Sequence, residues 1–460
     1  ARPDAFSYRA GRFLRRHRTA AMATVAVVAI ISGLVGTYTW QLAAAKNESE
    51  AIAGFLQEVI LSATPGKTGV GGSVLDVVDG ASRRIESEFE DQPRVRAEIH
   101  SILGYSYVHM QRYAEGEEQA LKAYTLSKQL YGDSHEKTRT TRHILMAARY
   151  APNQKRDISD LIAEQQRTAP ATPDVHVIQL HSILGAAAWR DGDLEQSLVH
   201  AETAHKLAEQ ILDEDDRARI FATHNYGRRL IDANRFDEAE QILREAIRLT
   251  EISDYPDLRS DARMDLASVY YMLKDYETAI EIYQESLDFA IEARGQVNVF
   301  TAMINDNIGM SLAALGRYDE ALERFELSLV WKLELHGETD PRTTGTMSLI
   351  GRHGSRGDMD KGRPYFERAL QGAMSFWPDG HFRIGVIYNS YSATLYREGL
   401  YAEAVEKALL ARQAFERNPS PYPDDLTRNT HLLKDSYEAL GDMQQMEAWA
   451  VKLAELEAGE

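Results

Sequence analysis

The stretch Thr64–Gly72, TPGKTGVGG, comes nearest to a motif with catalytic chemistry. Gly66, Lys67 and Thr68 match the end of a phosphate-binding loop, whose backbone N–H groups and lysine hold nucleotide phosphates. The full motif needs a glycine five residues before Gly66, where this sequence has Leu61, and no hydrophobic strand leads into the stretch. The sequence here therefore predicts a flexible linker rather than a nucleotide site.

No other arrangement typical of catalysis or metal binding occurs in the 460 residues. The absence of cysteine excludes disulfides, thiolate metal sites and cysteine nucleophiles. The fourteen histidines do not cluster at ligand spacing, and His100 and His181 recur in a repeated HSILG segment, which favours packing or surface roles. A net charge of -18 argues against binding nucleic acid, whose phosphates require lysine and arginine. We therefore expect no catalytic residue, metal ligand or cofactor in this chain.

Helix pairs must position whatever this chain binds, because the sequence repeats itself from about residue 94. The segments HNYGRRLIDANRFDEAEQILREAIRL, MDLASVYYMLKDYETAIEIYQESL and NDNIGMSLAALGRYDEALERFELSL share a template of two amphipathic helices joined by a short turn. Residues that mark the first helix recur about every 40 to 42 positions, with a degenerate unit near Met146: Gly104, Gly185, Gly227, Ala267, Gly309, Gly351, Ser392 and, more loosely, Lys434. About nine units follow from this spacing.

The second helix of each pair carries its own small residue. Alanine recurs there at Ala239, Ala279, Ala321 and Ala404. A small side chain is expected because neighbouring helices cross at close range at these points. Two units depart from the template and are expected to be distorted: unit two (139–166), and unit seven (346–373), where Gly362 replaces the alanine.

This pattern resembles the tetratricopeptide repeat, in the long-helix variant of kinesin light chains, over Arg94–Glu457. The resemblance implies an all-α, right-handed solenoid that binds a protein or peptide on a concave surface lined by the first helices. Asparagine could pair with an extended backbone and arginine with carboxylates. The groove candidates are Asn225, Arg228, Asn307, Arg352, Asn389, Trp189, Tyr271 and Tyr396. The alternative is that these are ordinary solvated helix residues.

The N-terminal region predicts a membrane anchor. Thr19–Ala45 contains no charge, and its apolar centre Ala20–Trp40 is long enough to cross a bilayer; the alternative is a cleaved signal peptide. The preceding cations are Arg2, Arg9, Arg12, Arg15, Arg16 and Arg18. By the positive-inside bias, the N-terminus is cytoplasmic and the repeats are periplasmic. The small residues Ala29 and Gly33, and Ser32 and Gly36, are spaced for helix pairing, which would make a homodimer.

The predicted organisation is a basic cytoplasmic segment (1–18), a transmembrane helix (19–41), a helical linker region (42–93) with a loop at 63–73, and the solenoid (94–457). The region Tyr8–Tyr124 also resembles the part that follows the catalytic domain in bacterial receptor-type serine/threonine protein kinases with tetratricopeptide repeats. That resemblance implies an extracytoplasmic sensor or scaffold joined to an upstream kinase, which would use ATP and Mg²⁺. The alternative is a kinase-free membrane-anchored adaptor or assembly protein.

Overall fold

Helices make up the regular structure of the chain wherever it is described. The computed structural model describes residues 37–39, 42–43, 45–59, 74–110, 112–150, 156–378, 380–420 and 424–459, and no strand occurs among them. Apart from 37–39, the predicted transmembrane helix lies outside these residues, as do the segment 1–18 and the loop 63–73. The pairing residues Ala29, Ser32, Gly33 and Gly36 also lie outside them. None of the described helices combines the length and apolar character needed to cross a membrane.

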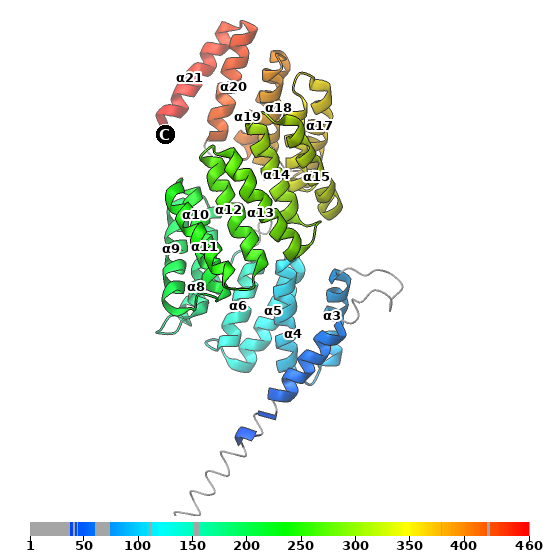
Figure 1. The fold of residues 1–460 in the computed structure, drawn as a ribbon, viewed down its shortest axis with the longest axis vertical. Coiled ribbons are helices and arrows are strands. Elements are labelled where there is room, and N and C mark those ends of the chain that lie inside the picture. Colours follow the sequence, from blue (N-terminus) through cyan, green and yellow to red (C-terminus); the bar gives the residue numbers. More distant parts are fainter. Residues whose placement is uncertain are drawn as a thin grey trace, which may run out of the picture. The chain divides into compact units, whose positions relative to one another are not determined.

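The chain divides into two compact units, Ala1–Ala171 and Thr172–Glu460. Both are built from helices that pack with the next helix along the chain (Figure 1). The first unit contains residues 45–59, which are helical, and α3 (Val74–Glu88), α4 (Pro93–His109), α5 (Tyr113–Tyr131), α6 (Glu136–Arg149) and α7 (Ser159–Arg167). The fold is an all-helical solenoid of the tetratricopeptide type, as predicted.

Helix α3 packs onto the first repeat of its unit and shares a core with it. Apolar side chains of residues 45–59, α3 and α4 form one cluster, which includes Phe55, Ile85 and Ile99. The ring of His100 is fully buried and hydrogen-bonds through Nδ1 to Gln119 at 2.7 Å and through Nε2 to Glu86 of α3 at 3.1 Å. The predicted packing role of His100 is therefore confirmed.

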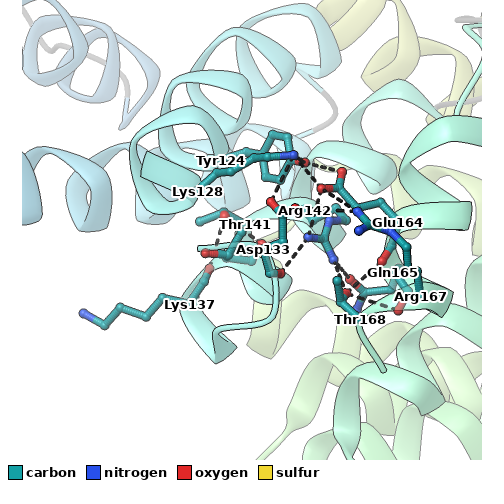
Figure 2. Close-up of polar contacts among 11 residues, drawn as sticks. Tyr124, Lys128, Asp133, Lys137, Thr141, Arg142, Glu164, Gln165, Arg167 and Thr168 are labelled. Carbon is teal, nitrogen blue, oxygen red and sulfur yellow. Dashed lines mark hydrogen bonds and ion pairs between the residues drawn. The ribbon is translucent and has the colours of Figure 1, made fainter. Parts of the chain in front are cut away.

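A buried arginine holds the degenerate second unit together. The side chain of Arg142 on α6 is fully buried and donates to Gln165 Oε1 at 2.7 Å, Thr168 Oγ1 at 2.9 Å and the Asp133 carbonyl oxygen at 2.9 Å (Figure 2). Glu164 lies 3.7 Å from the same guanidinium. Because these partners come from α7 and from the turn before α6, a polar network connects segments that the repeat template joins by apolar packing.

The second unit contains seven helix pairs. These are α8 (Val175–Arg190), α9 (Leu194–Ile211), α10 (Arg217–Asp232), α11 (Phe236–Glu251), α12 (Pro256–Met272), α13 (Tyr276–Arg294), α14 (Val299–Ala314), α15 (Tyr318–His336), α16 (Pro341–Gly354), α17 (Met359–Phe376), α18 (Phe382–Arg397), α19 (Tyr401–Arg417), α20 (Asp424–Leu440) and α21 (Met443–Gly459). Asp174 caps α8 by accepting from His176 N and Val177 N, and Pro256 and Pro341 open their helices where no N–H donor is needed.

The small residues of the template lie where helices cross. A Cβ added at Gly227 would stand 2.7 Å from Leu243 Cγ, and one at Gly309 would stand 2.6 Å from the ring of Phe325. At Ser392 the close approach allows Oγ to donate to the Ala404 carbonyl oxygen at 2.6 Å. The sequence predicts the close crossing at the second-helix alanines, and Ala239, Ala279, Ala321 and Ala404 are indeed fully buried.

The turn after each first helix typically has a residue in the left-handed region seven positions after the small residue. This conformation is adopted even by Asn234 (φ 57°) and Lys274 (φ 65°). Unit seven differs, because Gly357 has φ 70° only six residues after Gly351, and α17 begins eight residues after Gly351 where the other second helices begin nine after their small residue. A Cβ at Gly362 would lie 1.7 Å from Ser355 Oγ. The departure of this unit from the template is therefore a first helix that ends early, at Gly354, and a second helix that begins one residue sooner.

Candidate functional site

The first helices of the second unit line its concave side. Among the described residues, four of the six pairs of consecutive first helices contact one another across repeat boundaries, namely α8 with α10, α10 with α12, α16 with α18 and α18 with α20, whereas α12 with α14 and α14 with α16 do not do so to this extent. In the part of the chain that is described, no two consecutive second helices pack to this extent. In a curved stack the neighbouring elements are closest on the inner side, so the first helices form the concave surface.

The predicted groove residues all lie on these first helices. Their exposure differs: Arg228, Arg352 and Trp189 are exposed, whereas Asn225, Asn307, Asn389, Tyr271 and Tyr396 are half-buried. The carboxamides of Asn225 and Asn307 have no hydrogen-bond partner among the described residues, so both could bind a ligand. Asn389 differs, because its Oδ1 accepts from Asn429 Nδ2 at 3.1 Å and so links α18 to α20.

The aromatic candidates take part in packing between helices. Tyr271 lies with its ring 5.4 Å from that of Tyr276, and Tyr396 lies 5.4 Å from Tyr401; each partner opens the following helix. This recurrence at equivalent positions indicates a structural role in the repeat. The ring of Trp189 on α8 instead lies 5.0 Å from the guanidinium of Arg229 on α10, a cation–π contact between neighbouring first helices.

Three arginines meet at the junction of α16 and α18, and we call them the arginine cluster. Arg352 lies near the end of α16, Arg356 in the turn that follows, and Arg397 at the end of α18. Arg397 donates from Nη2 to the Arg352 carbonyl oxygen at 3.0 Å and from Nε to Glu398 at 2.7 Å. The Arg356 guanidinium lies 3.7 Å from the centre of the Tyr318 ring. Neither Arg352 nor Arg356 forms an ion pair with a described residue.

The electrostatics of His353 show how close these charges are. Burial, and then the positive charges of Arg352, Arg356 and Arg397, lower the pKa of His353 to about 4. Burial also lowers the pKa of Arg352, and the two other arginines lower it further, against the opposing effect of Tyr271. Arg352 nevertheless has substantial exposed surface. Arg352 is therefore partly enclosed by protein and still exposed to solvent, as expected for a side chain at the bottom of a concave surface.

The turn of unit seven is tied to the next first helix. Gly357 N donates to Glu398 Oε2 at 3.0 Å, which connects the turn after α16 to the end of α18. By contrast, α17 and α18 pack less extensively than any other consecutive helices of this unit, while α16 and α18 contact each other. The first helices therefore provide much of the contact between these two repeats. That geometry brings side chains of α16 and α18 toward one another.

Arg228 lies near carboxylates, in contrast to Arg352. Burial raises the pKa of Asp232 against the opposing charges of Arg229 and Arg228. His224 Nε2 lies 2.7 Å from Asp265 Oδ2. Burial would raise the pKa of Asp265, but the hydrogen bond and charge of His224, helped by Arg228 and Arg229, outweigh it and lower the pKa. Neither Arg228 nor Arg352 forms an ion pair with a described residue, but two carboxylates lie near Arg228, whereas no carboxylate is among the groups that shift the pKa of Arg352.

Arg356 and Arg397 were missed by the sequence interpretation, which selected residues next to the small residue or one turn away. Both lie five positions after the small residue of their unit, Gly351 and Ser392 respectively. Extending the register by one position would have identified the pair. The sequence did not indicate the contacts at this junction, such as that of Gly357 N with Glu398, because they join residues of different repeats.

Comparisons with known proteins agree with this architecture. A tetratricopeptide repeat family model matches residues 176–252 and 258–329. The chain carries tetratricopeptide repeats. Kinesin light chain-related 3 of Arabidopsis thaliana is 28% identical over 184 residues, which cover 39% of this chain and 28% of that protein. The match thus spans little more than a quarter of the relative.

Two solved structures show the same fold at low sequence identity. A Rap protein complexed with competence and sporulation factor has a TM-score of 0.57 at 13% identity, covering 79% of this chain and 98% of that one. Aspartyl phosphate phosphatase F from Bacillus subtilis has a TM-score of 0.50 at 15% identity, covering 79% and 94%. Neither the family match nor these relatives support the predicted kinase or membrane anchor, which stay predictions.

Proposed function

We propose that the concave surface of residues 172–459 binds an extended segment of a partner protein. The observation that carries this proposal is a row of first helices presenting polar side chains that form no hydrogen bond or ion pair with another described side chain, including Asn225, Asn307 and Arg352. A carboxamide offers both a donor and an acceptor to an extended backbone. The Rap protein of similar fold, crystallised with competence and sporulation factor, supports the idea that such a solenoid can hold a ligand.

Site-specific photo-crosslinking in the full chain tests where the partner binds. A photoreactive residue at Ala314, which is exposed at the end of the first helix α14, should capture the partner. The same residue at Val330, which is 60% exposed on the second helix α15, should not. Equal capture from both positions, or capture from Val330 alone, would contradict binding on the concave side.

A pair of asparagine variants tests the chemistry of binding. The double variant Asn225→Ala/Asn307→Ala should lower recovery of the partner, because it removes two unpaired carboxamides without breaking a hydrogen bond inside the fold. Asn389→Ala serves as the control, since Asn389 is already bonded to Asn429. Full recovery with the double variant would remove the asparagines from the site.

For the whole chain we propose a sensor or scaffold anchored by residues 19–41, with the repeats in the periplasm and an ATP-dependent kinase on the cytoplasmic side. The arginines before residue 19 and the uncharged run that follows support this arrangement. Reporter fusions at residue 18 and at residue 45 test the topology. A coding region that lacks a glycine-rich loop and a catalytic aspartate upstream would instead favour a kinase-free adaptor.

A further inference from the structure

The arginine cluster carries more positive charge than its surroundings neutralise. Its three guanidinium groups face one bound carboxylate, that of Glu398, which accepts from Arg397 Nε and from Gly357 N. Neither Arg352 nor Arg356 forms an ion pair with a described residue, although, against the effect of burial, the pKa of Glu398 is lowered by its hydrogen bonds, by the charge of Arg397 and then by that of Arg356. This local excess is notable in a chain whose net charge is -18, where acidic groups outnumber basic ones.

Like charges held together on a protein surface cost free energy unless something else offsets it. In this cluster the three guanidinium groups lie close enough that all of them act on His353, and two of them act on the third. Two backbone contacts hold the junction closed against this repulsion, from Arg397 to the Arg352 carbonyl and from Gly357 N to Glu398. A bound anion would relieve the repulsion directly.

The arrangement of the donors indicates the kind of anion. A guanidinium has a planar fork that matches a carboxylate in a two-point contact. Arg397 already uses Nε and Nη2 within the fold, so the forks of Arg352 and Arg356 are the ones left for a ligand. Arg352 and Arg397 lie together at the junction, whereas Arg356 is held against the ring of Tyr318. The donors thus occupy two places, which suits two neighbouring carboxylates better than one compact group.

We propose that the arginine cluster is a subsite for two neighbouring carboxylates of an acidic peptide segment, bound between α16 and α18. This inference rests on the proposed peptide-binding function and assigns the chemistry of one part of that surface. Binding here also bridges the least tightly packed junction of the second unit. The ligand therefore stabilises the closed junction, because it neutralises the arginines only while α16 and α18 are together.

Binding of a simple acidic probe to the full chain tests the subsite. Fluorescein-labelled hexaglutamate should bind in a fluorescence anisotropy titration, and its affinity should fall as NaCl is raised from 50 to 300 mM. Hexaglutamine with the same label should not bind. The double variant Arg352→Gln/Arg356→Gln should weaken hexaglutamate binding roughly tenfold or more, since it removes two charge-assisted contacts.

A matched control removes the same kind of charge elsewhere in the second unit. Arg417 is exposed at the end of the second helix α19 and has no ion pair with a described residue. Arg417→Gln should bind hexaglutamate as the unaltered chain does. Equal weakening by Arg417→Gln, or no weakening by the double variant, would overturn the proposal. Tighter binding of a phosphoserine peptide than of hexaglutamate would overturn the assignment to carboxylates.

Hydrogen exchange gives a second readout that a purely structural role would not move. Saturating hexaglutamate should slow amide exchange at the ends of α16 and α18 in the unaltered chain and not in the double variant. If the photoreactive residue at Ala314 still captures the partner while hexaglutamate has no effect, peptide binding stands and the carboxylate subsite fails. Loss of both would refute the proposed function itself.

Discussion

The buried arginine of unit two permits a sharp prediction about stability. Arg142→Met keeps most of the length of the side chain and removes the guanidinium. The three hydrogen bonds to Gln165, Thr168 and the Asp133 carbonyl are lost with it. Thr168 Oγ1 still bonds the Glu164 carbonyl at 2.8 Å, so the groups left without a partner are chiefly the Gln165 amide oxygen and the Asp133 carbonyl.

The expected cost follows from burial. Leaving a buried acceptor unpaired costs about 1–3 kcal/mol, and breaking a buried charge network costs about 3–5 kcal/mol in all. Arg142 is fully buried, and the ring of Tyr124 lies 5.6 Å from its guanidinium, so water cannot readily replace it. The methionine side chain offsets part of this destabilisation, because it occupies the space of the aliphatic part of Arg142. We therefore expect Arg142→Met to lower the free energy of unfolding of this region by about 3 kcal/mol.

Hydrogen exchange is the suitable assay, because it reports opening free energies for α5, α6 and α7 separately from the second unit. The control is Arg167→Met, whose side chain is 67% exposed and lies 3.5 Å from Asp133 in the same network. An exposed ion pair contributes about 0–1 kcal/mol, so this variant should change little. If Arg142→Met changes the exchange no more than Arg167→Met does, the network does not hold unit two together.

Three further predictions concern the second unit. Gly309→Ala should destabilise it by about 1–2 kcal/mol, because the new methyl would lie 2.6 Å from a buried phenylalanine ring, whereas Gly345→Ala, in an open helical position, should stabilise it by up to about 1 kcal/mol; both are measured by urea unfolding. The pKa of His353 is about 4 in the folded protein against an ordinary 6.5, so the unfolded chain binds the proton more readily. The free energy of unfolding should therefore fall as pH is lowered from about 6.5 to 4. His353→Phe should remove roughly 2–4 kcal/mol of this pH dependence, measured by urea unfolding at several pH values. Lys332 and Asp306 form a buried ion pair. Asp306→Leu should lower the free energy of unfolding by about 3–5 kcal/mol, because it leaves the lysine charge buried without its partner, and adding Lys332→Met should restore most of the thermal stability. A double variant as unstable as Asp306→Leu would contradict this explanation.

Much of the second unit could be predicted from the sequence, because each repeat restates the same physical requirement. A small residue at a helix crossing recurs with a fixed period, and Gly227 and Gly309 are indeed points where an added Cβ would meet the second helix at under 3.0 Å. The division of the chain near residue 171 could not be predicted in this way. It follows a unit in which hydrogen bonds of the buried Arg142 replace apolar packing between the helices. Such a polar network produces no periodic pattern in the sequence.

The groove residues show the same limit. The position within the repeat predicts that Asn225 and Arg352 lie on the concave side. It does not show whether a side chain there is available to a ligand or already hydrogen-bonded or packed within the fold. Asn389 is bonded to Asn429, and Tyr271 packs on Tyr276. These pairings depend on contacts between helices that are far apart in the sequence, so they required the structure.

The irregular unit seven links these two conclusions. Its sequence reads as a worn repeat, with glycines at positions where the template has other residues. In the structure α16 ends early, at Gly354, and the turn that follows has Gly357 at φ 70°. In this turn Gly357 N donates to Glu398, and Arg356 lies against the ring of Tyr318. The usual alanine at position 362 would not fit this arrangement, because its Cβ would lie 1.7 Å from Ser355 Oγ. The irregular unit therefore has contacts of its own rather than merely lacking those of the template, and the Arg352→Gln/Arg356→Gln variant tests whether they serve binding.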